Sequence, residues 1–133
     1  MADSISRLHN AVLAARTADP AKSRTARLLQ AGGAKVGKKL AEEAVEVVID
    51  AMNGHPEAVV RESADLMYNL VVLWVHAGVT PDQVWAEMRR RERLFGIAEK
   101  LPKDLAKPEP REPRHKSAPK VVSLQARRAS KRR

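Results

Sequence analysis

Apolar residues recur at helical spacing through most of the chain up to Pro102, between segments rich in Gly and Pro. In residues 35–52, for example, Leu40, Ala44, Val47 and Val48 share one face of a helix. The same periodicity predicts five helices, which we expect to be joined by short connections. They are expected at about Ser4 to Thr17, Ser23 to Gln30, Lys35 to Met52, Pro56 to Ala77 and Thr80 to Phe95.

Residues at the ends of these segments are those that favour helix starts and stops. Ser23 is expected to be an N-cap, and Pro56 stands at a first helical position. Gly78 is suited to a C-terminal cap, where a left-handed backbone is common. Thr80 followed by Gln83 is a capping-box pattern.

The fourth segment differs from the others because it is apolar nearly all round from Leu66 onward. A helix of this kind is normally buried, so we expect it to be central. Polar side chains on a buried helix need partners. The preceding segment, residues 35–52, carries a matching polar stripe. The polar exceptions on the fourth segment are Glu62, Asp65, Asn69 and His76.

Charge separates the chain into two parts. Residues 1–102 hold 14 Lys and Arg against 13 Asp and Glu, a net charge of +1, whereas residues 103–133 hold 11 against 3, a net charge of +8. The second part is rich in Pro, Lys, Arg and Ser and has no helical periodicity. We therefore expect an all-α domain over 1–102 and a basic disordered tail over 103–133.

Composition excludes several classes of protein. The chain has no Cys, so disulfides, thiolate zinc sites and a Cys nucleophile are ruled out, and a reducing compartment such as the cytoplasm fits. The N-terminus lacks the apolar run of a signal peptide. The longest apolar stretch, Leu66 to Val79, contains Asn69 and His76 and is too short to span a bilayer, so no membrane association is expected.

Two pairs of acidic residues have the spacing that places both members on one helix face. Glu43 and Glu46 precede the turn at 53–56, and Glu62 and Asp65 follow it, each pair at i,i+3. An antiparallel hairpin would bring all four carboxylates to one level. Because carboxylates held together repel each other unless a cation lies between them, the pattern indicates a divalent-metal site.

Oxygen ligands of this kind suit Mg²⁺, which commonly bridges to the phosphates of a substrate. The corresponding chemistry is hydrolysis of a phosphoanhydride. Glu42 is placed to orient a water molecule, and three lysines precede the acids and are candidate phosphate ligands: Lys35, Lys38 and Lys39. The residues alone leave alternatives open. Acid pairs also form solvated helix faces, and Lys–Glu pairs at i,i+4 can stabilise a helix without binding a ligand.

These residues carry a resemblance to a known family. The chain resembles the phosphoribosyl-ATP pyrophosphohydrolases, MazG-like all-α nucleotide pyrophosphatases of the second step of histidine biosynthesis. The resemblance covers roughly Ile5 to Lys103 and rests on SRTARLLQAG, KKLAEEAVEVVIDAMNG and RESADLMYNLVVLW. The acidic blocks match an EExxE pattern followed by ExxD, here Glu42, Glu43, Glu46, Glu62 and Asp65.

The resemblance implies Mg²⁺-dependent hydrolysis of phosphoribosyl-ATP to phosphoribosyl-AMP and pyrophosphate. It implies metal ligation by Glu43, Glu46, Glu62 and Asp65, with Glu42 assisting. It also implies a helix bundle completed by a second copy in a homodimer or higher homo-oligomer. An apolar helix that two or three neighbours cover only partly in one chain is consistent with that assembly.

The chain departs from the usual family pattern at three positions. Many members have Gly at Ala41, an aromatic residue at Arg24 and His at Asn69. Asn can exchange hydrogen bonds with a substrate but cannot carry a proton near neutral pH, so we expect Asn69 to bind substrate.

Two alternative functions are compatible with the sequence. One is a house-cleaning hydrolase of non-standard nucleoside triphosphates, which would use the same chemistry on another substrate. The other is a weakly active paralogue whose basic tail contacts nucleic acid by counterion release. A solvated tail that binds nothing is the favoured reading of that charge.

Overall fold

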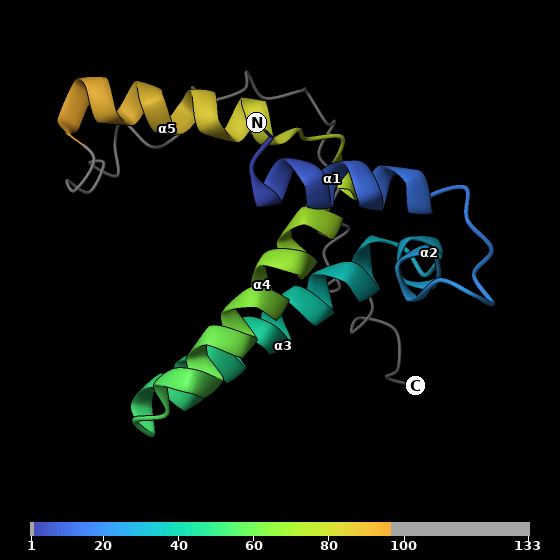
Figure 1. Cartoon of the computed structure of the whole chain (residues 1–133), viewed down its shortest axis with the longest axis horizontal. Coiled ribbons are helices and arrows are strands. Elements are labelled where there is room, and N and C mark those ends of the chain that lie inside the picture. Colours follow the sequence, from blue (N-terminus) through green and yellow to red (C-terminus); the bar gives the residue numbers. More distant parts are fainter. Residues whose placement is uncertain (1, 97–133) are drawn as a thin grey trace, which may run out of the picture. The chain divides into compact units, whose positions relative to one another are not determined.

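The computed structural model describes residues 2–96, and this part of the chain is all helical and contains no strand (Figure 1). The all-α prediction is thereby confirmed. Four of the five predicted helices have bounds close to those expected, and the third begins at Gly33 instead of Lys35. In chain order they are α1 (Ser4–Ala15), α2 (Arg24–Gln30), α3 (Gly33–Met52), α4 (Pro56–Ala77) and α5 (Pro81–Phe95).

Helices α3 and α4 form an antiparallel hairpin and make the most extensive contact between elements of the described chain (Figure 1). The connection needs a left-handed residue, which Gly54 provides at φ 69°. Pro56 begins α4, and Gly78 at φ 73° ends it, as the sequence predicts. The hairpin sets the two acid-bearing helices side by side.

The hydrophobic core lies at the end of this hairpin away from the turn. It is built from Val12 of α1, Val36 of α3, and Val71, Val72 and Val75 of α4, all with 6% exposure or less. Figure 1 shows α1 crossing the C-terminal end of α4. Within one chain only the C-terminal half of α4 is therefore buried, so the prediction of a central helix holds for that half alone.

A buried histidine connects α1 by a hydrogen bond to the residues that follow α4. His9 is 7% exposed, and its Nε2 lies 3.2 Å from the carbonyl oxygen of Val79, to which it donates in the tautomer that satisfies both groups. The hydrogen bond connects positions far apart in the sequence. It helps hold α1 over the core.

Helix α5 begins with the capping box that the sequence predicts. The Thr80 hydroxyl accepts from the Gln83 amide, and the Gln83 side chain accepts from the Thr80 amide. Trp85 of α5 meets Trp74 of α4 edge to face, with ring centroids 6.3 Å apart. The two tryptophans thus join the helices as packing residues.

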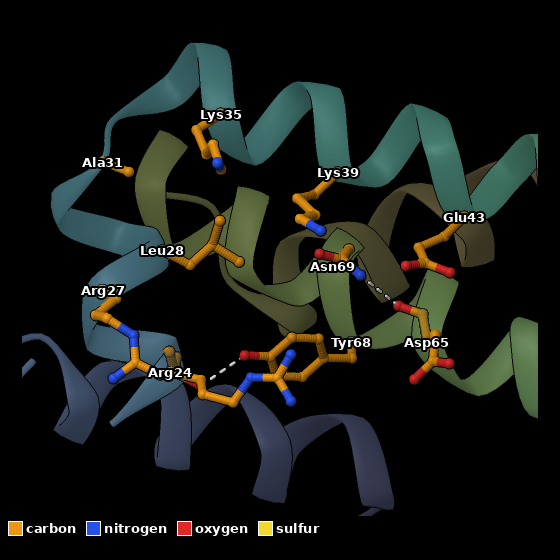
Figure 2. Close-up of a pocket in the computed structure, with 11 residues that line it drawn as sticks. Arg24, Arg27, Leu28, Ala31, Lys35, Lys39, Glu43, Asp65, Tyr68 and Asn69 are labelled. Carbon is orange, nitrogen blue, oxygen red and sulfur yellow. Dashed lines mark hydrogen bonds between the residues drawn. The ribbon is translucent and has the colours of Figure 1, made fainter. Parts of the chain in front are cut away.

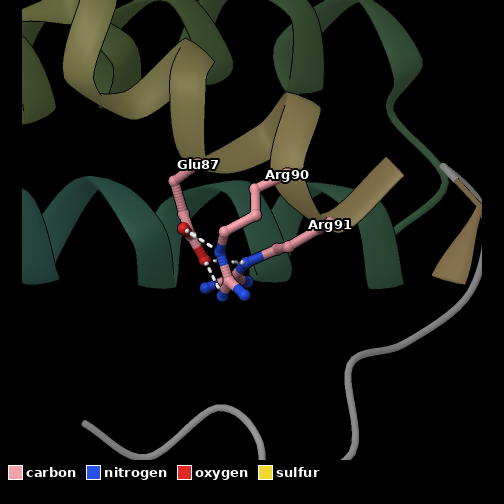
Figure 3. Close-up of polar contacts among 3 residues, drawn as sticks. All are labelled: Glu87, Arg90 and Arg91. Carbon is pink, nitrogen blue, oxygen red and sulfur yellow. Dashed lines mark hydrogen bonds and ion pairs between the residues drawn. The ribbon is translucent and has the colours of Figure 1, made fainter. Parts of the chain in front are cut away.

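A small ion-pair network lies on the exposed side of α5 (Figure 3). The Glu87 carboxylate accepts from Arg90 Nε and Arg91 Nε, each at 2.8 Å. Hydrogen bonds from Arg90 and then Arg91 lower the pKa of Glu87 to about 2. Because all three side chains are close to solvent, the network contributes little to stability.

The predicted boundary at residue 102 and the predicted tail over 103–133 lie outside the described residues. Among the residues that are described, no helix combines the length and the apolar character that a bilayer span requires.

Helix α2 carries one wall of the candidate site, and its N-cap offers a test of how firmly that wall is held. The Ser23 hydroxyl accepts from the Ala26 amide at 3.1 Å. Ser23→Ala should lower the free energy of unfolding by about 1 kcal/mol in urea titrations followed by circular dichroism. Ser23→Asp keeps an acceptor at the cap and is the matched control. Equal stability of the alanine variant and the wild type would show that the cap contributes nothing.

Candidate active site

Three of the four predicted ligands form one cluster across the α3–α4 interface. Carboxylate oxygens of Glu43 on α3 and of Glu62 and Asp65 on α4 all lie within 4.8 Å of one another. Glu43 and Glu62 are half-buried, and Asp65 is exposed. The antiparallel hairpin brings these residues together as expected from their distances to the turn.

Glu46, the fourth predicted ligand, acts directly on this cluster. A hydrogen bond shared with Glu46, together with partial desolvation and the charges of Glu46 and Glu43, raises the pKa of Glu62 to about 7. Two carboxylates can share a hydrogen bond only when one of them is protonated. In the absence of a cation, a proton therefore relieves the repulsion among these four residues, and a divalent cation would relieve it more completely.

Glu42 lies beside the cluster. Its carboxylate is 4.0 Å from Lys38 Nζ and 3.9 Å from Lys39 Nζ, within one turn of α3. Lys38 is 74% exposed and does not line the cavity described next. Its predicted role in substrate binding therefore stays a prediction, and its visible contact is the pair with Glu42.

A cavity of about 880 Å³ extends from the acids toward α2 (Figure 2). Its size suits a nucleotide-like ligand. Helix α2 and its C-cap provide Arg24, Thr25, Arg27, Leu28 and Ala31. Helices α3 and α4 provide Lys35, Lys39, Glu43, Asp65, Tyr68 and Asn69.

The cavity has an acidic end and a basic end. Figure 2 shows Glu43 and Asp65 at one side, Lys35 and Lys39 directed inward from α3, and Arg27 at the far side. A phosphate chain can bind the cationic wall while its phosphoryl oxygens reach a cation held by the acids. The arrangement can therefore bind an extended polyanion and place one of its phosphoanhydrides beside the carboxylates.

Asn69 is the buried polar residue of this cavity. It is 5% exposed, and its side-chain Nδ2 donates to the Asp65 carbonyl oxygen at 2.9 Å, one turn earlier in α4. The hydrogen bond fixes the side chain directly behind a predicted metal ligand (Figure 2). An amide held in this way can orient a substrate or a carboxylate, but it cannot relay a proton near neutral pH.

Sequence reasoning missed the contribution of α2. The Tyr68 and Thr25 hydroxyls are 2.6 Å apart and tie α4 to α2 across the cavity. Arg24, Arg27 and Leu28 share one face of α2 because of their i, i+3, i+4 spacing. That spacing is visible in the sequence, but nothing there indicates that this face of a short helix turns toward the acids.

Comparisons with known proteins cover the part of the chain that holds this site. The family model described as "Phosphoribosyl-ATP pyrophosphohydrolase" matches residues 5–92, which include every residue that lines the cavity. A protein of Rhodopseudomonas palustris named "Phosphoribosyl-ATP pyrophosphatase 2" is 74% identical over 103 residues, 77% of this chain and 79% of its own.

Two further relatives extend the likeness. A protein of Bradyrhizobium diazoefficiens, also named "Phosphoribosyl-ATP pyrophosphatase 2", is 62% identical over 133 residues, 99% of each chain. The "Phosphoribosyl-ATP pyrophosphatase" of Gluconobacter oxydans is 48% identical over 96 residues, 72% of each chain. With the family model matched over most of its length, this chain belongs to the phosphoribosyl-ATP pyrophosphohydrolase family.

Proposed function

We propose that this chain hydrolyses phosphoribosyl-ATP to phosphoribosyl-AMP and pyrophosphate in the second step of histidine biosynthesis, with Mg²⁺ as its metal. Family membership supports the reaction. The observation that carries the assignment of the site is the carboxylate cluster of Glu43, Glu62 and Asp65 at the end of a cationic cavity. A biosynthetic role and the absence of Cys are consistent with a cytoplasmic protein.

The donor set fits a hard divalent cation. Every candidate ligand in the cluster is a carboxylate oxygen. The pKa of Glu62 is raised in part by repulsion from neighbouring carboxylates, which a cation would neutralise. We assign the metal to Glu43, Glu46, Glu62 and Asp65. When bound, Mg²⁺ supplies Lewis-acid polarisation of the phosphoryl oxygens and neutralises charge that develops on them.

The remaining residues have roles in binding and orientation. Lys35 and Lys39 bind phosphate oxygens of the substrate from the α3 wall. Glu42, held close to Lys38 and Lys39, orients the attacking water. Asn69 positions the substrate beside Asp65. In this assignment no proton passes through Asn69, and a carboxylate or bulk water accepts the proton of the nucleophile.

We further propose that the active form is a homodimer or higher homo-oligomer. Four apolar residues of α3 recur at i, i+3, i+4, i+7 and are at least half exposed: Val45, Val48, Ile49 and Met52. On α4, Val60 is 70% exposed and Met67 is 47% exposed. These six residues, the hairpin stripe, lie on the half of the hairpin that α1 leaves open, and apolar patches of this kind usually mark an interface.

Removing one acid tests the catalytic assignment. Purified wild-type protein with Mg²⁺ should release pyrophosphate from phosphoribosyl-ATP, and Glu46→Gln should slow the release by roughly 100-fold or more. Glu57→Gln on α4 lies outside the cluster and should leave the rate unchanged. A Glu46→Gln enzyme that turns over at the wild-type rate would remove Glu46 from the site.

The raised pKa of Glu62 gives a pH-dependent prediction. Because the folded pKa of about 7 lies above the ordinary value of 4.5, the metal-free fold loses stability from this group as pH rises from 4.5 through 7. Mg²⁺ should therefore raise the melting temperature more at pH 8 than at pH 5.5. In Glu62→Gln the increase in melting temperature caused by Mg²⁺ should be smaller and independent of pH. The same increment at both pH values in the wild type would contradict a cation site at Glu62.

The proposed assembly is tested by a charge on the hairpin stripe. Wild-type protein should sediment as a dimer or larger species, and Val48→Arg should shift it toward monomer and reduce activity. Ala86→Arg on the exposed side of α5 adds the same charge elsewhere and should leave the assembly intact. A monomeric, fully active wild type would refute the proposed assembly.

A further inference from the structure

The cavity holds more positive charge than one end of a phosphate chain requires. Lys35 and Lys39 on α3 are joined by Arg24 and Arg27 on α2, so four cations line a single cavity. Within the described residues Arg24, Arg27 and Lys35 form no ion pair, and Lys39 has only a 3.9 Å contact with Glu42. The charges of these side chains are therefore available to a ligand.

The cations are divided between two helices. Lys39 is one turn of α3 away from Glu43, so its amine is placed for phosphates close to the acids. The arginines belong to α2. Figure 2 shows Arg27 at the side of the cavity away from Glu43 and Asp65, and the guanidinium of Arg24 beside Tyr68, between Arg27 and the acids. A ligand with one anionic group at the acids and a second at α2 would use both sets.

The substrate class under the proposed function has this form. Phosphoribosyl-ATP carries a triphosphate and, on the added ribose, a separate phosphate monoester. With the triphosphate directed to the carboxylate cluster, the second phosphate is left for the opposite end. A phosphate monoester is recognised well by guanidinium groups, whose planar donors bind two oxygens at once.

We propose that Arg24, with Arg27 one turn later, binds the phosphate of the phosphoribosyl group and so selects phosphoribosyl-ATP over nucleoside triphosphates that lack it. This inference rests on the proposed function. Arg27 Nη1 donates to the Pro20 carbonyl oxygen at 2.7 Å, which ties that side chain to the loop before α2. Arg24 makes no side-chain hydrogen bond within the described residues, so its donors are free for the phosphate.

Helix α2 is also fixed in position against the rest of the cavity. Thr25, between the two arginines, is bonded to Tyr68 of α4 at 2.6 Å. Ala26 is buried at 1% exposure. The arginines therefore project from a helix that is fixed on both sides, which is what discrimination between similar ligands requires.

The test compares two ligands in one set of variants. For phosphoribosyl-ATP, Arg24→Gln should raise KM about tenfold or more and change kcat by less than about threefold, since the phosphate that Arg24 binds takes no part in the reaction. The inhibition constant of ATP, which lacks the second phosphate, should not change. Arg24→Lys keeps the charge without the planar fork and should restore part of the affinity. Arg16→Gln, at the C-cap of α1 and outside the cavity, is the matched control and should match the wild type.

The outcomes separate this inference from the proposed function. Equal losses for phosphoribosyl-ATP and ATP would mean that Arg24 binds the triphosphate, and no loss for either would mean that it binds nothing; both results overturn the inference. If wild-type protein does not hydrolyse phosphoribosyl-ATP, the proposed function fails. Calorimetric titration with phosphoribosyl-AMP and AMP then decides the inference, which requires that Arg24→Gln weaken only the phosphoribosyl-AMP complex.

Discussion

Repulsion among carboxylates across the α3–α4 interface is the constraint around which this site is organised. Glu43, Glu62 and Asp65 converge within 4.8 Å, and the nearby Glu46 raises the pKa of Glu62. Such a group destabilises the hairpin that carries it unless a proton or a cation is bound. The raised pKa of Glu62 is the consequence, and the contact between α3 and α4 holds the acids together. Under the proposed metal assignment, cation binding would therefore stabilise the fold.

The hairpin performs different tasks along its length. At the end away from the turn, valines of α3 and α4 pack beneath α1 and form the core. In the middle the acids face the cavity whose other wall is α2. Toward the turn the apolar hairpin stripe remains exposed in a single chain. One pair of helices thus provides the core, the proposed metal site and the proposed subunit interface, and a change in its register would alter all three.

Much of this arrangement was predictable from the sequence because local signals agree with the fold. Helical periodicity, the Ser23 and Thr80 caps and Gly78 gave the helices to within a few residues. The convergence of the acid pairs followed from their spacing about the turn at 53–56, because an antiparallel hairpin has one natural register.

What sequence reasoning missed depends on tertiary contacts. The orientation of α2 is set by the buried Ala26 and by the hydrogen bond between Thr25 and Tyr68, and neither has a local signature. Nothing in the sequence therefore indicates that Arg24 and Arg27 line a cavity. His9 likewise gave no sign that it would be buried against the Val79 carbonyl oxygen.

The most direct test of the central claim is the titration of Glu62 itself, followed by carbon NMR of its side-chain carboxyl group. The account predicts an inflection near pH 7 in metal-free protein, because Glu46 and Glu43 disfavour the charged form. Saturating Mg²⁺ should move that inflection to lower pH, because the cation replaces the proton. An inflection near the ordinary value of 4.5 that Mg²⁺ leaves unchanged would contradict the account.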